Sequence, residues 1–440
     1  MVGLKTAWPI IFLLTLQLGV RKVAAQKATL KNIITTDRIS SNHYSDIVLT
    51  EDGEAYIACF RKNKEGKDEV YICKINPEGI IEWTLGEGIL GRATAITKDS
   101  NNDIWVTGFY QGFWKTDKNQ HHSIEDKLFV LHLDQNGREL RWIENTVGSA
   151  KPYNIASNLN GEIMLHGAMG KSLGFNGREI NAEHEDAFFA IFDSDGDCKK
   201  LYPFGGAITK IQAFQNGFII TGRFHTRMSF MNQNYVTTGP LDNDGFIALY
   251  DEENSWFYQF GEPGYIKSGY RTLEGGIGVV IDDSNKIQVL GIKDLLVFIP
   301  LESPDPKIAS LFLITLNDQG KLISEKILIN RVTAKSPATI SKDSNDYYWI
   351  STGVQNDASI CGIAHSFGPE SKALLFSCNS SYKLTKIISM KHGPNTSIRS
   401  SYAQCKKIVF SGHYKECLKI EEKSIFNDGR HGLFYLSLEP

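Results

Sequence analysis

Residues 93–143 read ATAITKDSNNDIWVTGFYQGFWKTDKNQHHSIEDKLFVLHLDQNGRELRWI, and this stretch decides the fold. Two segments in it, IWVTGFY at 104–110 and KLFVLHL at 127–133, are almost entirely apolar, as strands covered on both faces are. The clusters SNND at 100–103 and QNG at 135–137 are rich in turn-forming residues. The pattern predicts two buried strands, each adjoining a short turn.

A weaker strand pattern flanks each turn. Residues 93–98 alternate as a strand does, and residues 138–143 form a mixed strand in which Arg138 and Arg141 discourage edge pairing. Residues 111–126 are polar, and we expect them to be irregular. Four antiparallel strands of this kind are the unit of a propeller blade.

The same phrase recurs about every 60 residues along the chain. Its second strand ends at a glycine, with Cys59 standing in the first copy: Gly108, Gly167, Gly222, Gly291, Gly353 and Gly412. Its third strand carries an aromatic residue before an acidic or amide residue, and Leu374/Asn379 is the weakest copy: Tyr71/Asn76, Phe129/Asp134, Phe188/Asp193, Phe246/Asp251, Phe312/Asn317 and Phe434/Glu439. The repeated glycine predicts a place where the backbone passes close to a neighbouring sheet, or a bulge.

Seven copies at this period imply a radially closed array, because one such sheet cannot bury both its faces alone. We therefore predict an all-β chain that forms a seven-bladed β-propeller of four-stranded antiparallel blades. The expected blades are residues 39–86, 87–146, 147–205, 206–262, 263–329, 330–391 and 392–440. The last copy has no fourth strand, and residues 27–37 precede the first copy without a partner. This N-terminal strand is expected to complete the last blade and to close the ring.

The N-terminus is a separate segment. Lys5 precedes an uncharged apolar run over residues 7–20, and Ala24-Ala25 offers small residues for cleavage. The run is too short to span a bilayer, so residues 1–25 are predicted to be a secretory signal peptide, with an uncleaved anchor as the alternative. We expect residues 26–440 to form one exported domain without a membrane span, in the periplasm, at the cell surface or outside the cell.

The charge and the cysteines of the chain limit which binding partners and which disulfides we expect. The chain carries 47 basic and 50 acidic residues, and the signal peptide removes three of the basic ones. A mildly acidic chain gives no electrostatic reason to expect binding of nucleic acid. We expect a monomer. The cysteines include no C-x-x-C pair: Cys59, Cys73, Cys198, Cys361, Cys378, Cys405 and Cys417. Cys59 and Cys73 lie on consecutive strands, where a disulfide is one alternative and buried thiols are the other.

The repeated phrase resembles the SBBP-type β-propeller repeats of secreted bacterial proteins. The resemblance is carried by DGFIALYDEEN at 244–254, EDKLFVLHLDQNGRELRW at 125–142, NDIWVTGFYQG at 102–112 and GFIITGRF at 217–224. It covers the mature chain, although copies five to seven lose the tryptophan after the third strand. The resemblance implies export and a propeller, and it brings no catalytic residues with it.

Long segments between the second and third strands are the predicted functional face, since binding usually resides in long loops on a rigid scaffold. They are residues 111–126, 168–185, 224–243, 292–307, 354–371 and 413–430. The candidate binding residues on or beside them are aromatic or cationic: Trp114, Arg223, His225, Arg227, Phe230, Tyr235, His413 and Tyr414. In the alternative, Trp114, Phe230 and Phe367 fold back and cover blade edges.

Two more specific motifs do not indicate a metal site. Residues 193–197 read DSDGD, which resembles a calcium loop, but they occupy the position of a hairpin turn, and we predict a turn. His121 and His122 are adjacent rather than spaced for joint metal ligation. We therefore predict no metal, no cofactor and no catalytic residue.

Three functions are compatible with this pattern. The first is a non-enzymatic exported propeller that binds a protein or a surface glycan through the long loops. The second is a carbohydrate-active or other enzyme with its site at the mouth of the central channel. The third is a structural protein of the cell envelope. Carboxylates or histidines that converge at the channel mouth would favour the enzyme.

Overall fold

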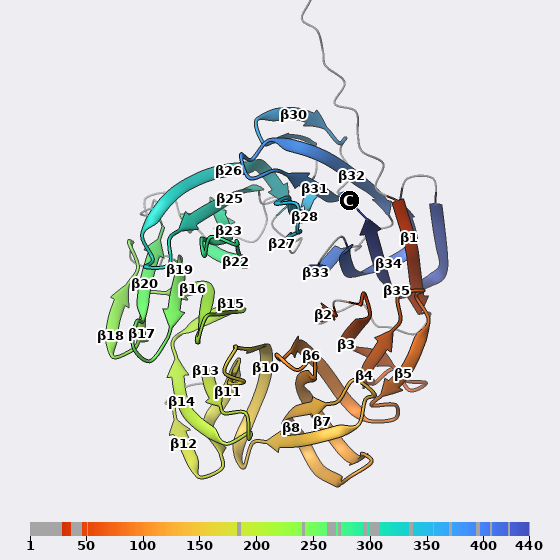
Figure 1. The fold of residues 1–440 in the computed structure, drawn as a ribbon, viewed down its shortest axis with the longest axis vertical. Coiled ribbons are helices and arrows are strands. Elements are labelled where there is room, and N and C mark those ends of the chain that lie inside the picture. The colour runs from red at the N-terminus through yellow and green to blue at the C-terminus, as the bar shows by residue number, and fades with distance from the viewer. Residues whose placement is uncertain are drawn as a thin grey trace, which may run out of the picture.

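The fold is described from a computed structural model, and every regular element in the described residues is a β-strand. The described residues are 29–36, 46–50, 52–182, 186–239, 243–261, 270–271, 274–293, 297–298, 308–333, 338–354, 356–368, 372–392, 397–404, 407–420 and 423–439. The strands form antiparallel sheets that stand around a central axis, as Figure 1 shows. Within the described ranges, no helix could cross a lipid bilayer.

The strands nearest the axis follow one another around it (Figure 1). They are β2 (Asp46–Leu49), β6 (Leu90–Lys98), β10 (Val147–Ser157), β15 (Gly206–Phe214), β22 (Gly275–Ile281), β27 (Thr339–Lys342) and β33 (Ser397–Gln404). Each pairs with a second strand: β3 (Ala55–Lys62), β7 (Ile104–Lys115), β11 (Ile163–Phe175), β16 (Gly217–His225), β23 (Ile287–Lys293), β28 (Tyr348–Val354) and β34 (Lys407–Ile420).

Third strands pair with the second strands on their outer side. They are β4 (Asp68–Ile75), β8 (Gln120–Leu133), β13 (Asp186–Phe192), β19 (Asn243–Tyr250), β25 (Ile308–Leu316), β31 (Lys372–Cys378) and β35 (Lys423–Glu439). The outermost partners are β5 (Ile81–Leu85), β9 (Glu139–Glu144), β14 (Cys198–Phe204), β20 (Trp256–Phe260), β26 (Leu322–Thr333), β32 (Leu384–His392) and β1 (Thr29–Thr36). The N-terminal β1 pairs antiparallel with β35, from Thr29 opposite Glu439 to Thr36 opposite Leu433.

The hydrophobic core lies between the faces of neighbouring sheets. One cluster joins Trp105 and Val130 of one sheet to Leu165 and Phe188 of the next. Second and third strands are covered on both faces in this way, which explains why IWVTGFY and KLFVLHL are almost entirely apolar.

The repeated Asp or Asn closes the hairpin between the third and fourth strands. Asp134 Oδ1 accepts hydrogen bonds from the N–H groups of Asn136 at 2.8 Å and Arg138 at 2.9 Å. Asn379 Oδ1 does the same for Ser381 and Lys383. The side chain thus takes the place of a backbone acceptor in the turn. In residues 193–197, Asp193 Oδ1 accepts from the Asp197 N–H at 2.8 Å, so the predicted turn is confirmed.

The repeated glycine lies where a bulge of the inner strand brings two backbones together. The inner strand β15 bulges between Ile208 and Lys210, and Gly222 lies opposite Ile208. A Cβ on Gly222 would collide with the carbonyl oxygen of Ala207. The expected bulge is therefore present, and the close approach seen here is between two strands of one sheet.

The prediction of an irregular segment at 111–126 was wrong. β7 and β8 continue as a hairpin in which Phe113 pairs with His122 and Lys115 with Gln120. Similar extensions are built from β11 with β12 (Arg178–Asn181), β17 (Arg227–Phe230) with β18 (Gln233–Val236), and β29 (Asp357–Ile360) with β30 (Ile363–Ser366). A further short pair joins β21 (Tyr270–Arg271) to β24 (Val297–Phe298).

Three of these hairpins fold back over their own sheets, whereas β29 pairs with β26 of the neighbouring sheet, with Ile360 opposite Ile329. Asn119, at the tip between β7 and β8, donates from Nδ2 to Glu139 Oε1 of β9 at 2.7 Å. Arg178, at the start of β12, donates from Nε to the Cys198 carbonyl of β14 at 2.6 Å. Tyr235 of β18 stacks on Phe257 of β20 with 3.8 Å between the ring centroids. We call these extensions the straps, because each covers the outer part of a sheet.

Candidate binding site at the mouth of the central channel

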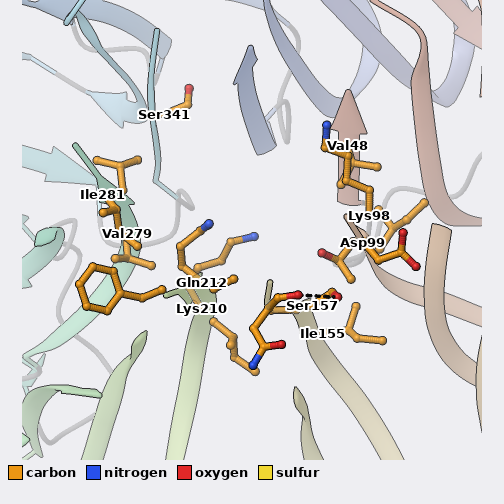
Figure 2. A pocket seen from close by; sticks show the side chains of 18 of the residues that line it. Val48, Lys98, Asp99, Ile155, Ser157, Lys210, Gln212, Val279, Ile281 and Ser341 are labelled. Atoms are coloured by element: carbon orange, nitrogen blue, oxygen red, sulfur yellow. Dashed lines mark hydrogen bonds between the residues drawn. The ribbon is translucent and has the colours of Figure 1, made fainter. Parts of the chain in front are cut away.

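The inner strands end around a cavity of about 520 Å³ on the axis of the ring, shown in Figure 2. Its lining comes from the last residues of β6, β10, β15, β22 and β27, together with β2 and Ser401 of β33. The short turns between first and second strands follow directly, since Ser100 and Asn285 also line the cavity. The cavity therefore lies at the end of the channel opposite to the predicted functional face.

Three lysines and two aspartates are the charged residues in this lining. Lys98 Nζ is 3.5 Å from Asn102 Oδ1. Lys342 pairs with Asp346 at 2.7 Å and with Asp283 at 3.7 Å. Burial opposes the charge on Lys342, but the hydrogen bond to Asp346 and the nearby aspartates raise its pKa. Lys210 has no acidic partner within 4.0 Å among the described residues, and Figure 2 shows it beside Gln212 at the cavity.

The two aspartates of the lining are engaged by backbone groups. Asp46 Oδ1 accepts from the Ile47 N–H at 3.0 Å, and Oδ2 accepts from the Ile96 N–H at 3.3 Å. Asp99 Oδ1 accepts from the N–H groups of Asn101 at 2.8 Å and Asp103 at 3.1 Å. Both carboxylates are thus held by the scaffold, and three lysines share the lining with them.

Asp99 also belongs to a cluster with Asp103 and His132 whose possible ligand atoms lie within 4.8 Å of one another. Its Oδ2 accepts from Trp105 Nε1 at 3.3 Å and lies 3.2 Å from His132 Nε2. Burial opposes ionisation, but the His132 and backbone hydrogen bonds lower the pKa of Asp99.

The same arrangement recurs where no histidine is present. Asp343 Oδ1 closes the corresponding turn by accepting from the Asn345 and Tyr347 N–H groups. Asp343 Oδ2 accepts from Trp349 Nε1 at 2.9 Å, as Asp99 Oδ2 does from Trp105. We therefore assign the Asp99 contacts to the turn and to the packing of Trp105, rather than to a metal ion.

The remaining lining is a mixture of apolar and neutral polar groups. Val48, Ile155, Val279 and Ile281 supply apolar surface around the cavity (Figure 2). The hydroxyls of two lining serines, Ser341 and Ser401, are buried and have no hydrogen-bond partner in the described part of the chain. Buried hydroxyls without partners are uncommon, and here they adjoin a space that a polar ligand fits.

None of the six predicted binding residues whose side chains the structure describes lines this cavity. Trp114 is 1% exposed, among Tyr110, Phe129 and Trp142. Phe230 is 3% exposed and packs on Phe257. Burial argues against ligand contact by either residue. All three aromatic residues of the alternative, Trp114, Phe230 and Phe367, are buried, as that alternative requires.

The other predicted residues are placed along the straps and second strands. Arg223 and His225 lie exposed on β16, Arg227 lies exposed on β17, and Tyr235 is half-buried on Phe257. Ligand binding by these four residues stays a prediction. His413 and Tyr414 are on β34, and their side chains lie outside the described structure.

A repeated tetrapeptide could have identified two of the lysines that the residue pattern missed. Lys98 and Lys342 both begin Lys-Asp-Ser-Asn, at 98–101 and 342–345. Each lysine is the last residue of its inner strand, and the following aspartate closes the turn. A lysine next to such a turn is therefore placed at the channel mouth by the blade geometry.

No family model and no curated protein matches this chain. Among solved structures, the polysaccharide lyase Uly1 is similar with 9% identity and a TM-score of 0.51, over 92% of each chain. Virginiamycin B lyase from Staphylococcus aureus has 12% identity and a TM-score of 0.46, over 92% of this chain and 98% of the other. A PL25 ulvan lyase has 10% identity and a TM-score of 0.47, over 88% and 93%. The similarity is to β-propeller lyases, and at this identity it shows the fold alone.

Proposed function

We propose that this chain is an exported, non-enzymatic β-propeller that binds an anionic glycan at the mouth of its central channel. The observation that carries the proposal is the set of Lys98, Lys210 and Lys342 around one cavity in which Asp46 and Asp99 are held by backbone N–H groups. An ammonium group recognises carboxylate or sulfate as a point charge. The amide of Gln212 and the serine hydroxyls suit the neutral hydroxyls of a sugar.

The proposed ring has seven blades and is closed by β1. Support comes from the inner strands, each of which has second and third partners, and from the pairing of β1 with β35 in the place of a fourth strand. Export and the relation to SBBP-type repeats rest on the sequence pattern. A closed ring holds the inner strands rigidly, which fixes the lysines before a ligand arrives and lowers the entropic cost of binding.

The proposal is tested by calorimetric titration of the mature chain with oligosaccharides of one length. One set carries carboxylate or sulfate groups and the other is neutral. We expect binding of the anionic set only, weakened about tenfold, or about 1.4 kcal/mol, in Lys210→Gln. Lys171→Gln is the matched control, because Lys171 is exposed on β11 and does not line the cavity. Equal binding of both sets would contradict the proposal.

The enzyme alternative is examined with the same samples. After long incubation, the anionic oligosaccharides are analysed by chromatography for shorter chains. A non-enzymatic protein returns them intact. Shortened products that disappear in Lys210→Gln would place turnover at the channel mouth, and the non-enzymatic part of the proposal would then be withdrawn.

A further inference from the structure

The strap formed by β29 and β30 ends at a cysteine. Cys361 and Gly362 form the tip of this hairpin, with φ of 49° and 80°. The Cys361 N–H donates to the Leu328 carbonyl of β26 at 2.7 Å, which fixes the tip against the neighbouring sheet. The hairpin thereby holds the Cys361 side chain in one place, although the residue itself is only half-buried.

The tip of this strap meets a second cysteine. Cys378 is the last residue of β31 and is fully buried, opposite Tyr348 of β28. Cys361 packs against the hydrophobic cluster that contains Cys378, and the two thiols lie within hydrogen-bonding reach of each other. Other straps are tied down at the corresponding end of the sheet by polar contacts, such as Asn119 with Glu139.

The two thiols differ in acidity and in access. The hydrogen bond from Cys378 lowers the pKa of Cys361, whereas the hydrogen bond to Cys361 and burial raise the pKa of Cys378. Cys361 therefore forms a thiolate more readily, and it is the one that solvent reaches. These are the properties of the thiol that attacks first in thiol–disulfide exchange.

We propose that Cys361 and Cys378 form a disulfide that locks the β29–β30 strap onto its sheet. The oxidant is a disulfide compound, RS–SR. The Cys361 thiolate attacks one sulfur of RS–SR and releases RS⁻, leaving a mixed disulfide on Cys361. Cys378 then loses its proton, its thiolate attacks Cys361 Sγ, and the second RS⁻ leaves. Two protein thiols are oxidised, one RS–SR is reduced, and the two protons end on two RSH molecules.

A second pair of buried cysteines gives an internal control. Cys59 of β3 is opposite Tyr71, and Cys73 of β4 is opposite Ile57. The two cysteines are thus diagonal neighbours in adjacent strands, where Cα atoms are about 7 to 8 Å apart. Disulfides need Cα atoms closer than about 7 Å, so Cys59 and Cys73 stay reduced without a backbone movement. Proximity in a sheet is therefore not sufficient for a disulfide.

The experiment uses the full mature chain, first reduced and then incubated with oxidised glutathione. Free thiols are alkylated, and the tryptic peptides are identified by mass spectrometry. We expect a linked peptide pair containing Cys361 and Cys378, and alkylated Cys59 and Cys73. Alkylation of both Cys361 and Cys378, or a link between Cys59 and Cys73 in their place, would overturn the proposal.

Two variants test the order in which the two cysteines react. In Cys378→Ser, the mixed disulfide cannot be resolved, so a glutathione adduct accumulates on Cys361. In Cys361→Ser, the buried Cys378 stays unmodified. The oxidised parent should also unfold at a temperature a few degrees higher than the reduced parent, because the disulfide closes a short loop between residues 361 and 378 and so restricts the unfolded chain. A glutathione adduct that persists on Cys361 in the parent would show that Cys378 does not reach it. The disulfide is independent of what the channel mouth binds.

Discussion

The ring of Phe129 lies across the strand pair from Gly108 and occupies the space that a side chain at Gly108 would need. The two residues are directly opposite in β7 and β8, and a Cβ on Gly108 would be 2.7 Å from Phe129 Cε1. The Arg92 carbonyl of the bulged inner strand approaches from the other side. Gly167 with Phe188 and Gly291 with Phe312 repeat the pairing. The glycine and the aromatic residue of the repeated phrase are thus one packing unit.

Gly108→Ala should destabilise the protein by about 2 to 4 kcal/mol, because the Arg92 carbonyl is backbone and the Phe129 ring is held by Trp114 and Trp142. Thermal unfolding followed by circular dichroism measures the effect. Gly205→Ala is the control, since a Cβ there meets only atoms at 3.6 Å and beyond. A change within about 0.5 kcal/mol is expected for the control. Equal melting temperatures for Gly108→Ala and the parent would contradict this account.

His166 takes the place of a threonine in the repeat. Thr107 and Thr221, just before the corresponding glycines, donate from Oγ1 to the carbonyls of Phe129 and Phe246. His166 Nε2 instead accepts from the Ile208 N–H at 3.4 Å, and its Nδ1 is buried without a partner in the described structure. Desolvation alone lowers the pKa of His166 to about 3.

Acid should therefore destabilise the fold through His166. Below the unfolded pKa of about 6.5, the unfolded chain binds a proton that the folded chain excludes, so stability falls as pH decreases from about 6.5 toward 3. The loss is at most about 1.4 kcal/mol for each pH unit in that window. His166→Thr restores the residue of the neighbouring copies and should flatten the dependence of melting temperature on pH between about 7 and 4.5. An unchanged dependence in the variant would show that other groups carry the acid sensitivity.

The repeated phrase predicted the all-β fold of antiparallel sheets because its residues act locally. Asp134 and Asn379 close turns with their own neighbours, and Gly222 marks a bulge of the adjacent strand. The straps were missed because their composition is polar. The side chains of the first strap alternate as those of a strand do, since Phe113 is 70% exposed and Trp114 is 1% exposed. An exposed hairpin face nevertheless has the composition of a loop.

The candidate site was harder to predict, because it is assembled from strands far apart in the chain. Lys98 and Lys342 share a tetrapeptide that marks the end of an inner strand. Lys210 has no such marker, and it faces the other lysines only because the sheets surround a common axis (Figure 1). Long polar segments with aromatic residues were interpreted as a binding face, whereas Trp114 and Phe230 are scaffold.

Deletion of residues 29–36 should lower the melting temperature by several degrees or more. Without β1, the backbone groups of β35 from Leu433 to Glu439 lose their outer partner and expose a sheet edge. Thermal unfolding and size-exclusion chromatography measure stability and edge-to-edge association. A chain that begins at Thr29 is the control and should behave as the parent. If the deleted chain unfolds at the parent temperature and stays monomeric, β1 does not close the ring.

The charge at the channel mouth should make glycan affinity depend on the salt concentration and on the sign of the charge at residue 210. Ammonium groups at a partly open cavity attract an anion less as the Debye length falls from about 10 Å at 0.1 M salt to about 3 Å at 1 M. We expect Lys210→Arg to retain binding, because it keeps the charge, and Lys210→Glu to abolish it, because it adds a carboxylate to a mouth whose aspartates are already held by the scaffold. Titration at several salt concentrations measures both effects. Binding that does not depend on salt, or equal binding by the Arg and Glu variants, would contradict this prediction. The ligand would then contact the apolar lining or another face, and the lysines would serve only the turns beside them.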